Sequence, residues 1–508
     1  MTVARAWSAA LVGLDARPVV VEAALGNGLP GLTVVGLPDA AVRESRERIR
    51  SALRQIGLPL PGRNLVVNLA PADLPKSGTG FDLAVALAIL AANGDVPAAG
   101  LDGVLLAGEL ALDGEIRPVP GVLSIAECAR AEGRLRLVVA PENAAEAAAV
   151  PGIVVLAAPH LGAVIAHVAG KALLAPWVVR PAAEPLAVDE PDLVDVRGQA
   201  LARRALEIAA AGGHNLLLSG PPGSGKTMLA RRLPGVLPPL SPEEALETTR
   251  IWSAAGRLPS GAGLMRVRPF RSPHHGASAA ALSGGGADPR PGELSLAHHG
   301  VLFLDELPEF RRDALEVLRE PLEEGIVRVT RAAGSRSFPA RFLLVAAMNP
   351  CPCGFRGDLR KPCTCSEHDV ARYRRKVSGP LLDRIDLHVE VPALPADDLG
   401  PGAEAEPSAG VRQRVVAARK RQAERTGDAR LTNAALSPAR LKGSAALHPE
   451  AAALLAKAMD RLALSARAHQ RVVRVARTIA DLEGAPGTTP AHVAEALRYR
   501  SQASPTAR

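Results

Sequence analysis

Hydrophobic positions change their spacing along the chain and so divide it into regions. In residues 1–175, short apolar runs at 19–21, 32–35 and 65–67 are separated by Gly and Pro, a pattern typical of strands. Helical spacing predicts helices over 40–56 and 81–92, and Asp39 can cap the first of them while Gly57 can end it. This mixture predicts an α+β domain over residues 1–175.

The rest of the chain shows two further patterns. Residues 176–191 are rich in proline and lack apolar periodicity, which predicts a linker. Strand and helix patterns alternate over residues 192–391, which predicts an α/β domain with a parallel sheet and helices on both faces. Residues 392–410 read as a second linker, and residues 411–508 are helical in pattern and rich in arginine.

Length and composition set broad limits. A chain of 508 residues is too long for one hydrophobic core, so several domains are expected. The formal net charge of +8 permits a polyanionic partner without demanding one. Asp15 and Arg17 interrupt the first apolar run, and no window resembles a membrane span, so we expect a cytoplasmic protein that does not cross a membrane.

A glycine-rich segment is the strongest chemical signal. It matches the phosphate-binding loop pattern throughout, and it lies between an apolar strand pattern and a helical one, as that pattern requires. Its backbone N–H groups can turn inward around phosphate oxygens. Lys226 is predicted to contact the β- and γ-phosphates of ATP, and Thr227 to ligate Mg²⁺. The predicted nucleotide-binding residues of this phosphate loop are Gly220, Pro221, Pro222, Gly223, Ser224, Gly225, Lys226 and Thr227.

Two more apolar runs end in polar side chains. The run 301–304 ends in Asp305 and Glu306, and the run 342–348 ends in Asn349. A buried strand would place Asp305 beside Mg²⁺ and Glu306 beside the attacking water as general base. Asn349 could orient that water, although an asparagine in such a place is more often a turn residue. The predicted catalytic residues are therefore Lys226, Glu306 and Asn349.

The order of these elements resembles AAA+ ATPases. Segments 291–300 and 379–387 resemble the Mg-chelatase-type branch, and the likeness to the bacterial YifB/ComM family covers nearly the whole chain. The resemblance implies a helical lid over 411–508, an arginine finger at Arg384 that reaches a neighbouring subunit's nucleotide, and a lid arginine at Arg467 that senses the γ-phosphate. Arg471 lies one turn further along the same predicted helix face and competes with Arg467 for that role.

Two insertions could grip a substrate. Residues 325–338 predict a β-hairpin, hereafter the arginine hairpin, that carries Arg328, Arg331 and Arg336. The family resemblance implies that such a hairpin contacts the DNA backbone, while an ordinary solvated hairpin is almost as compatible with the pattern. Adjacent His274 and His275 lie in the other insertion, where we interpret them as part of a polar loop rather than as metal ligands. The cation-rich run 411–427 supports a polyanionic partner only modestly.

Four of the five cysteines form a cluster within a short segment. Their spacing, C-x-C, nine residues, C-x-C, departs from the usual zinc knuckle but fits four thiolates around one tetrahedral Zn²⁺. Reduced cysteines on a shaped loop are the equally compatible alternative. This cysteine cluster consists of Cys351, Cys353, Cys363 and Cys365.

The N-terminal region resembles a peptidase domain. Segments 75–84 and 108–118 resemble the domain shared by Lon proteases and RadA, a fold similar to ribosomal protein S5. The resemblance puts the nucleophilic serine at Gly80 and the catalytic lysine near Ile125, and neither residue can do that chemistry. We therefore expect a peptidase-like fold without peptidase activity.

Together these patterns predict an ATP- and Mg²⁺-dependent AAA+ motor. The resemblance to ComM implies a homohexameric ring that acts on DNA as a helicase or branch-migration factor. A protein-remodelling or metal-chelatase-type ATPase is the alternative, and the missing Ser–Lys pair argues against an ATP-dependent protease.

Overall fold

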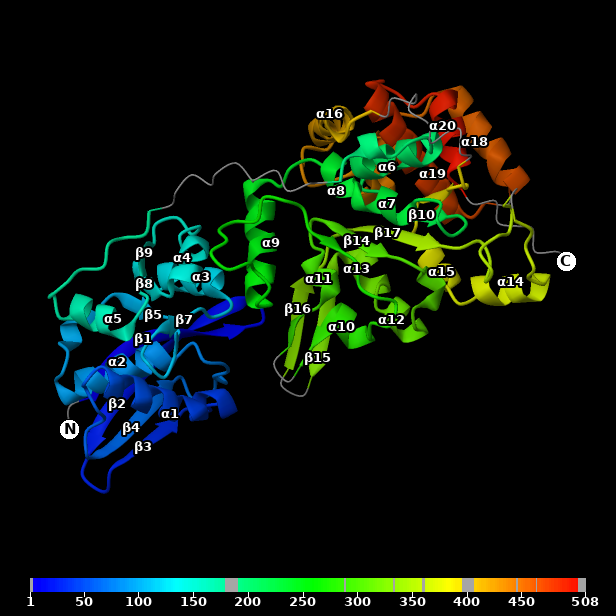
Figure 1. The fold of residues 1–508 in the computed structure, drawn as a ribbon. Helices are drawn as coiled ribbons and strands as arrows, with labels where there is room; N and C mark the ends of the chain where they lie inside the picture. The colour runs from blue at the N-terminus through cyan, green and yellow to red at the C-terminus, as the bar shows by residue number, and fades with distance from the viewer. Residues whose placement is uncertain are drawn as a thin grey trace.

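Two β-sheets organise the chain. One lies in the N-terminal part, coloured blue to cyan in Figure 1, and the other lies in the central part, coloured green to yellow. Residues 179–190 and 395–405, which make up most of the two predicted linkers, lie outside the described residues. This computed structural model describes residues 3–178, 191–286, 289–331, 334–358, 361–394, 406–444, 446–462 and 464–500.

The N-terminal sheet has seven strands in the order β3-β4-β2-β1-β5-β8-β9. Its first part is mixed, because β2 runs antiparallel to both β1 and β4, while β5, β8 and β9 are parallel. Apolar side chains alternate along β4, where Leu65, Val67 and Leu69 are buried. The strands are β1 (Val3–Val12), β2 (Asp15–Gly26), β3 (Gly31–Val35), β4 (Asn64–Ala70), β5 (Val104–Leu106), β8 (Arg136–Val139) and β9 (Val154–Ala157).

Five helices and a small hairpin complete this part. The Asp39 carboxylate accepts the N–H of Val42 at 2.8 Å and caps α1, as the sequence predicts. Helix α2 is buried around nearly its whole surface because it lies across the sheet, which explains its almost unbroken apolar sequence. The elements are α1 (Ala40–Gln55), α2 (Asp82–Asn93), α3 (Val122–Ala131), α4 (Pro141–Ala147), α5 (Leu161–Val168), β6 (Glu109–Leu110) and β7 (Ile116–Arg117).

The central sheet has five parallel strands in the order β11-β14-β17-β10-β18. The predicted apolar runs form β10, β14 and β17, which are buried along almost all of their length because helices cover the sheet. All five carboxyl ends lie along one edge. The strands are β10 (Leu216–Ser219), β11 (Phe270–Arg271), β14 (Val301–Leu304), β17 (Leu343–Met348) and β18 (Leu387–Glu390).

Short helices surround this sheet and carry the loops of interest. Two small antiparallel sheets lie beside it. One pairs β12 (Gly284–Gly285) with β13 (Arg290–Pro291). The other is the arginine hairpin, which pairs β15 (Ile326–Arg331) with β16 (Gly334–Pro339). The helices are α6 (Ala200–Gly212), α7 (Lys226–Arg231), α8 (Leu233–Val236), α10 (Ala279–Ser283), α11 (Glu293–Leu296), α12 (Arg312–Glu316), α13 (Arg319–Glu324), α14 (Glu367–Arg374) and α15 (Gly379–Leu382).

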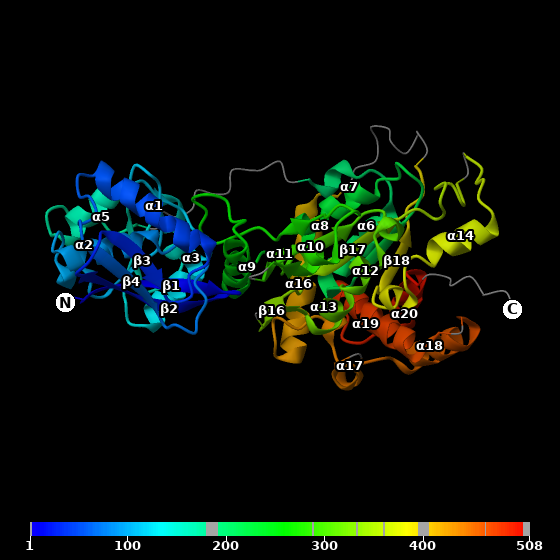
Figure 2. The ribbon, with the colours of Figure 1, turned by 90° about the horizontal axis from the view of Figure 1, so that it is seen from below.

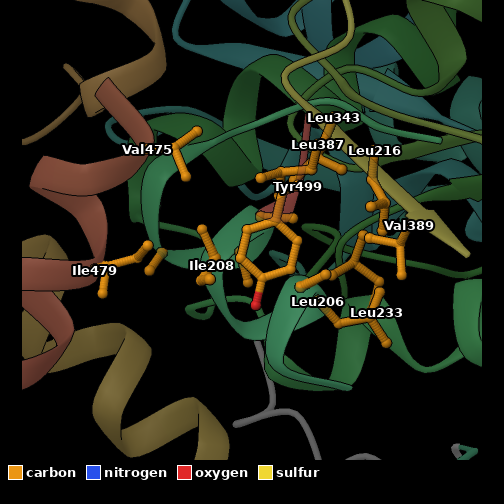
Figure 3. Packing of buried hydrophobic residues seen from close by; sticks show 14 of the residues in the cluster. Leu206, Ile208, Leu216, Leu233, Leu343, Leu387, Val389, Val475, Ile479 and Tyr499 are labelled. Carbon is orange, nitrogen blue, oxygen red and sulfur yellow. The ribbon is translucent and has the colours of Figure 1, made fainter. Parts of the chain in front are cut away.

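The C-terminal helices share a hydrophobic core with the central sheet. In Figure 3, Val475 and Ile479 of α19 and Tyr499 lie with Ile208 of α6 and Leu216 of β10 in one cluster. These helices therefore complete the core of the sheet instead of forming a core of their own. They are α16 (Ser408–Thr426), α17 (Pro438–Ser444), α18 (Pro449–Leu462), α19 (Ala466–Glu483) and α20 (Pro490–Arg498).

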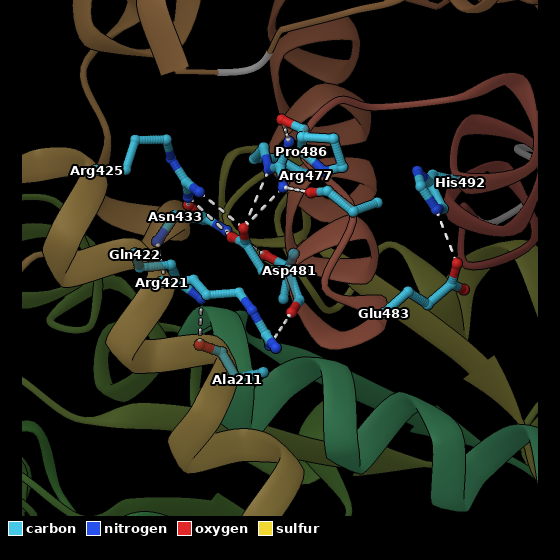
Figure 4. Close-up of polar contacts among 12 residues, drawn as sticks. Ala211, Arg421, Gln422, Arg425, Asn433, Arg477, Asp481, Glu483, Pro486 and His492 are labelled. Atoms are coloured by element: carbon cyan, nitrogen blue, oxygen red, sulfur yellow. Dashed lines mark hydrogen bonds and ion pairs between the residues drawn. The ribbon is translucent and has the colours of Figure 1, made fainter.

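A buried carboxylate ties these helices together (Figure 4). Asp481 accepts hydrogen bonds from Arg425 at 2.7 Å, Arg477 at 2.8 Å and Asn433 at 2.8 Å. Arg425 belongs to the cation-rich run at 411–427, and Arg419 of the same run donates to the carbonyl of Ala210 at 2.7 Å. These arginines therefore hold the fold together, which weakens the support that the run lends to a polyanionic partner.

Helix α9 (Pro242–Ala254) joins the two halves and lies between them in both ribbon views (Figures 1 and 2). Arg250 donates to the carbonyl of Leu14 at 3.0 Å and pairs with Asp15. One turn on, the Ser253 hydroxyl bonds to the buried carboxyl of Glu146, whose pKa is raised mainly by burial. The N-terminal domain is thus docked directly on α9.

No helix among the described residues is both long and apolar enough to span a bilayer.

Candidate active site

The phosphate loop connects β10 to α7 at the carboxyl edge of the central sheet. Gly223 and Gly225 have φ angles of 76° and 90°, a left-handed conformation that other residues rarely adopt. Gly220 lies so close to the carbonyl of Val391 that any side chain there would collide with the backbone. The loop therefore has the tightly wrapped shape that phosphate binding requires.

The loop lysine lies at the centre of the site. Lys226 is buried, and its Nζ donates to the carbonyls of Gly220 at 2.8 Å and Pro221 at 2.9 Å. It also donates to Oδ1 of Asn349 at 3.3 Å. Burial lowers the pKa of Lys226, and the carboxylate of Asp305 opposes that shift. The structure thus brings Lys226 and Asn349 together.

The predicted Mg²⁺ ligands also meet. The hydroxyl of Thr227 donates to Oδ2 of Asp305 at 2.7 Å, so α7 and β14 converge at this point. Glu306 follows with a positive φ of 53°, and its N–H donates to Oδ1 of Asp305 at 3.0 Å. A hydroxyl and a carboxylate are the oxygen ligands that Mg²⁺ prefers in nucleotide sites. The arrangement fits Mg²⁺ held beside the phosphate loop.

The sequence pattern predicts only a polar loop around His275, but the structure brings this side chain to the candidate active site. Its Nδ1 lies 3.1 Å from Oε2 of Glu306. The register explains why, because Arg271 of β11 pairs with Leu302 of β14, so the chain beyond Arg271 emerges at the same edge as Glu306. The ring of His274 lies next to that of His275, with centroids 4.0 Å apart and the ring planes tilted by 35°. The sequence gives little signal for this contact, because the strand before the loop consists only of Phe270 and Arg271.

Arg384 lies at the opposite end of the sheet from the phosphate loop. It follows α15, and its Nη1 donates to the carbonyl of Pro380 at 2.6 Å while Nη2 pairs with Glu323. The side chain borders a broad cavity of about 890 Å³, which Asn215 and Phe342 also line at the amino ends of β10 and β17. Arg384 therefore does not contact the phosphate loop of its own chain.

The lid arginines share that end of the sheet. Arg471 and Arg474 line the same cavity as Arg384, and Arg471 lies 3.8 Å from Asp386. Burial lowers the pKa of Arg471. Arg467 is exposed one turn earlier on α19. Arg467 therefore lies one turn from Arg471, whose side chain lines the cavity at the amino end of the strands, rather than at the carboxyl edge that carries the phosphate loop.

The three arginines of the arginine hairpin do not act as one patch. Arg328 pairs with Glu320 and, at 2.8 Å, with Glu324 of α13. Arg331 and Arg336 lie on the other face, because side chains alternate along a strand and Arg336 pairs across with Val329. Arg331 is exposed, although its guanidinium lies beside Gly285 of β12, whereas Arg336 is half-buried and packs against Gly13 of the β1–β2 turn.

Two clusters of metal-ligand side chains occur in the described part of the chain. The four sulfurs of the cysteine cluster lie within 4.8 Å of one another. Glu247, His298 and His299 form the other group. There, Nδ1 of His298 accepts the N–H of Arg341, so its Nε2 carries the proton and donates to Glu247 at 3.2 Å. That histidine is a hydrogen-bond donor, and only the cysteine cluster fits a metal.

The positions that correspond to a peptidase site also come together. Gly80 and Ile125 line one small cavity of about 60 Å³, together with Ser77, and Arg290 of the central part borders it. Lys76 is buried, and its Nζ donates to the carbonyl of Pro71. No lysine lines this cavity among the residues described, so a hydroxyl there has no amine base.

A parallel sheet with a phosphate loop at its carboxyl edge, supported by Asp305 and Asn349 from adjacent strands, defines a P-loop protein. Three family models agree with this class. The model described as magnesium chelatase, subunit ChlI, matches residues 192–399. The models described as subunit ChlI of Mg-chelatase and as the C-terminal part of subunit ChlI match residues 21–143 and 405–500.

Full-length relatives are more specific. The chain is 48% identical to the YifB protein of Escherichia coli, covering 97% of this chain and 96% of that protein. It is 46% identical to YifB of Salmonella typhimurium, over 99% and 97% of the two chains, and 45% identical to competence protein ComM of Haemophilus influenzae, over 99% and 98%. The chain belongs to the YifB/ComM family of Mg-chelatase-like AAA+ proteins, a membership that supports an ATPase that uses ATP and Mg²⁺.

Proposed function

We propose that this protein is an ATP-hydrolysing AAA+ motor in which each residue of the site has a defined role. Lys226 contacts the β- and γ-phosphates, Thr227 and Asp305 hold Mg²⁺, and Glu306 activates the attacking water while Asn349 orients it. The observation that carries the proposal is the meeting of Lys226, Thr227, Asp305 and Asn349 at one edge of the sheet. The cofactors are ATP and Mg²⁺, with a structural Zn²⁺ on the cysteine cluster.

The proposal includes a homo-oligomeric ring, most simply a hexamer. Arg384 lies a whole strand length from its own phosphate loop, so it can serve only a nucleotide bound to a neighbouring subunit. Arg467 and Arg471 lie at the same end and would meet that nucleotide from the same side. A positive cluster of this kind stabilises the charge that spreads over the γ-phosphate during transfer.

We propose DNA as the substrate of the motor, with helicase or branch-migration activity. One relative is named a competence protein, and the exposed Arg331 on a protruding hairpin suits phosphate oxygens. The pairing of Arg328 with two glutamates reduces the hairpin's free positive charge, so Arg331 carries most of the expected contact.

A protein-remodelling or metal-chelatase-type ATPase is the second candidate, supported by the magnesium-chelatase description of the matching family models.

One experiment separates the DNA motor from this second candidate. ATP hydrolysis by the full-length protein is measured alone and with single-stranded, duplex and branched DNA, and with an unfolded protein. We expect DNA, branched DNA above all, to stimulate turnover. Stimulation by the unfolded protein alone would favour the second candidate, and hydrolysis unaffected by any DNA would contradict the DNA motor.

A further inference from the structure

The spacing of the sulfurs in the cysteine cluster is that of a metal site. Cys351 Sγ lies 3.4 Å from Cys353 Sγ and 3.6 Å from Cys363 Sγ, and the last two are also 3.6 Å apart. Four sulfurs bound at about 2.3 Å around a tetrahedral Zn²⁺ lie about 3.8 Å from one another. A disulfide would require about 2.05 Å. The sulfurs therefore surround a common point without being bonded in pairs.

Backbone N–H groups are directed at the same sulfurs. The N–H of Cys353 donates to Cys365 Sγ at 3.4 Å, and Cys353 Sγ itself accepts from the N–H groups of Phe355 and Thr364. Four thiolates and one Zn²⁺ carry a net charge of −2, and donors of this kind stabilise that charge and fix the ligand directions. The loop thus supplies both the ligands and the hydrogen bonds that support them.

This loop packs directly on the candidate active site. It leaves β17 at Asn349, so Cys351 is only two residues away. Gly354 lies against the phosphate loop, where an added Cβ would come within 2.6 Å of Pro222 Cδ and 3.8 Å of Asn349 Cγ. On the other side, the backbone of Asn349 bonds to the hydroxyl of buried Tyr373, whose pKa burial raises to about 12. Asn349 is therefore held between the phosphate loop, the cysteine loop and α14.

We propose that the cysteine cluster binds one Zn²⁺ and that this metal positions Pro222 and Asn349 for ATP hydrolysis. The second half rests on the proposed ATPase function, whereas zinc binding does not. Zn²⁺ takes no part in the chemistry. It fixes the loop between β17 and α14, whose described residues, 349–358 and 361–366, contain no helix or strand, and a displacement of about 1 Å in such a loop is enough to lower turnover by about a hundredfold.

Metal content tests the first half. Full-length protein purified under reducing conditions is analysed for bound metals, beside Cys363→Ser/Cys365→Ser and Cys128→Ser. We expect about one zinc per chain in the wild type and in Cys128→Ser, whose residue is buried in α3 far from the cluster in sequence. The double variant should lose that zinc. A wild type that contains iron or no metal, or a double variant that retains its zinc, would overturn the assignment.

Two glycines of the same loop test the second half without removing a ligand. Gly354 and Gly357 have left-handed φ angles of 85° and 81°, so alanine strains the backbone at both, but only Gly354 faces Pro222. We expect Gly354→Ala to keep its zinc and to lower ATP turnover about tenfold or more relative to Gly357→Ala. Equal turnover in the two variants would overturn the positioning role. A wild type that hydrolyses no ATP would instead contradict the ATPase itself and leave the zinc count unaffected.

Discussion

Glu306 adopts a left-handed backbone conformation with a φ of 53°, which is unusual for a residue with a side chain. The sharp turn lets the chain leave β14 directly after Asp305, so both carboxylates stay at the edge of the sheet beside Thr227. Such conformations persist only where the surrounding structure holds them in place. Here the buried strand and the N–H of Glu306 on the Asp305 carboxylate supply that restraint.

Two substitutions should separate nucleotide binding from turnover. Lys226→Ala removes a charge-assisted contact to phosphate and should weaken ATP affinity by about 10- to 100-fold. Glu306→Gln keeps the shape but removes the base, so it should bind ATP normally and lower turnover by about 100-fold or more. Affinity for a fluorescent ATP analogue and the rate of phosphate release measure the two effects. A Glu306→Gln protein that turns over at the normal rate would rule out Glu306 as the base.

His275 should restrain the same carboxylate. Its Nδ1 is 3.1 Å from Glu306, and both side chains are partly exposed, so the contact contributes at most about 1 kcal/mol. Removing it in His275→Ala should free the base and raise ATP turnover in the absence of DNA about two- to fivefold. His274→Ala, which removes the neighbouring ring but not the contact with Glu306, is the control. Equal rates for the two variants would show that the contact does not restrain Glu306.

At the scale of elements, the arginine hairpin has a part buried in the core and a part exposed to solvent. Val327, Val329 and Phe338 anchor it in the core, while the strand pair continues beyond that anchor to Arg331 and Gly334. Alternation along β15 puts Arg331 on the opposite face from Arg328, whose charge α13 neutralises. The hairpin can therefore offer positive charge on one side only.

This asymmetry leads to a prediction for DNA binding. Arg331→Gln should weaken DNA binding uniformly across sequences and reduce the slope of log affinity against log salt by about 1. Arg328→Gln should change both quantities little, because that guanidinium already pairs with Glu320 and Glu324. Titrations of labelled duplex DNA at several salt concentrations measure the slope. The reverse ranking of the two variants would show that the hairpin grips DNA by its other face.

Elements could be predicted well from the sequence because their signals are local. The apolar run before Lys226 and the glycines after it specify β10 and the phosphate loop within a dozen residues. The place of Arg467 could not be deduced, because it depends on how α19 packs against α6 and α16 near the amino end of the sheet. The contact between His275 and Glu306 likewise depends on the pairing of β11 with β14, and a two-residue strand has almost no periodicity to detect.

At the scale of the whole molecule, the two ends of the central sheet carry different groups, and those groups could complement one another between copies of the chain. The carboxyl edge holds the phosphate loop, and the amino end holds Arg384 with Arg471 and Arg474 around a broad cavity. Copies stacked head to tail around a ring would bring the second surface of one subunit to the first surface of the next. Each active site would then be completed only by assembly.

Mixing two inactive variants tests this arrangement. Arg384→Ala should bind ATP normally but hydrolyse it about 1,000-fold more slowly, as expected when an arginine finger is lost. Mixed with Lys226→Ala, it should regain some activity, because an intact Arg384 then faces an intact phosphate loop at some interfaces. The rate of phosphate release across mixing ratios measures the recovery. Normal hydrolysis by Arg384→Ala alone would refute the finger.

Docking of the N-terminal domain should depend on one arginine of α9. Arg250→Ala removes the bonds to Leu14 and Asp15 and should weaken the docking by about 1–2 kcal/mol. Faster hydrogen exchange in the β1–β2 turn and in α3 measures the loss. Arg257→Ala, an exposed residue just beyond the same helix, is the control. Unchanged hydrogen exchange in Arg250→Ala would show that other contacts along α9 stabilise the docking.

The common core of the C-terminal helices and the central sheet restricts how far these helices can move relative to the sheet. A lid that swung freely would have to expose Val475, Ile479 and Tyr499 to water, at about 1.5–3 kcal/mol for each large apolar side chain. If the proposed ring forms, nucleotide-driven motion of that size would be easier between subunits than within one. Each copy of this chain would then move as a rigid body, and the conformational change would occur at the interfaces between copies.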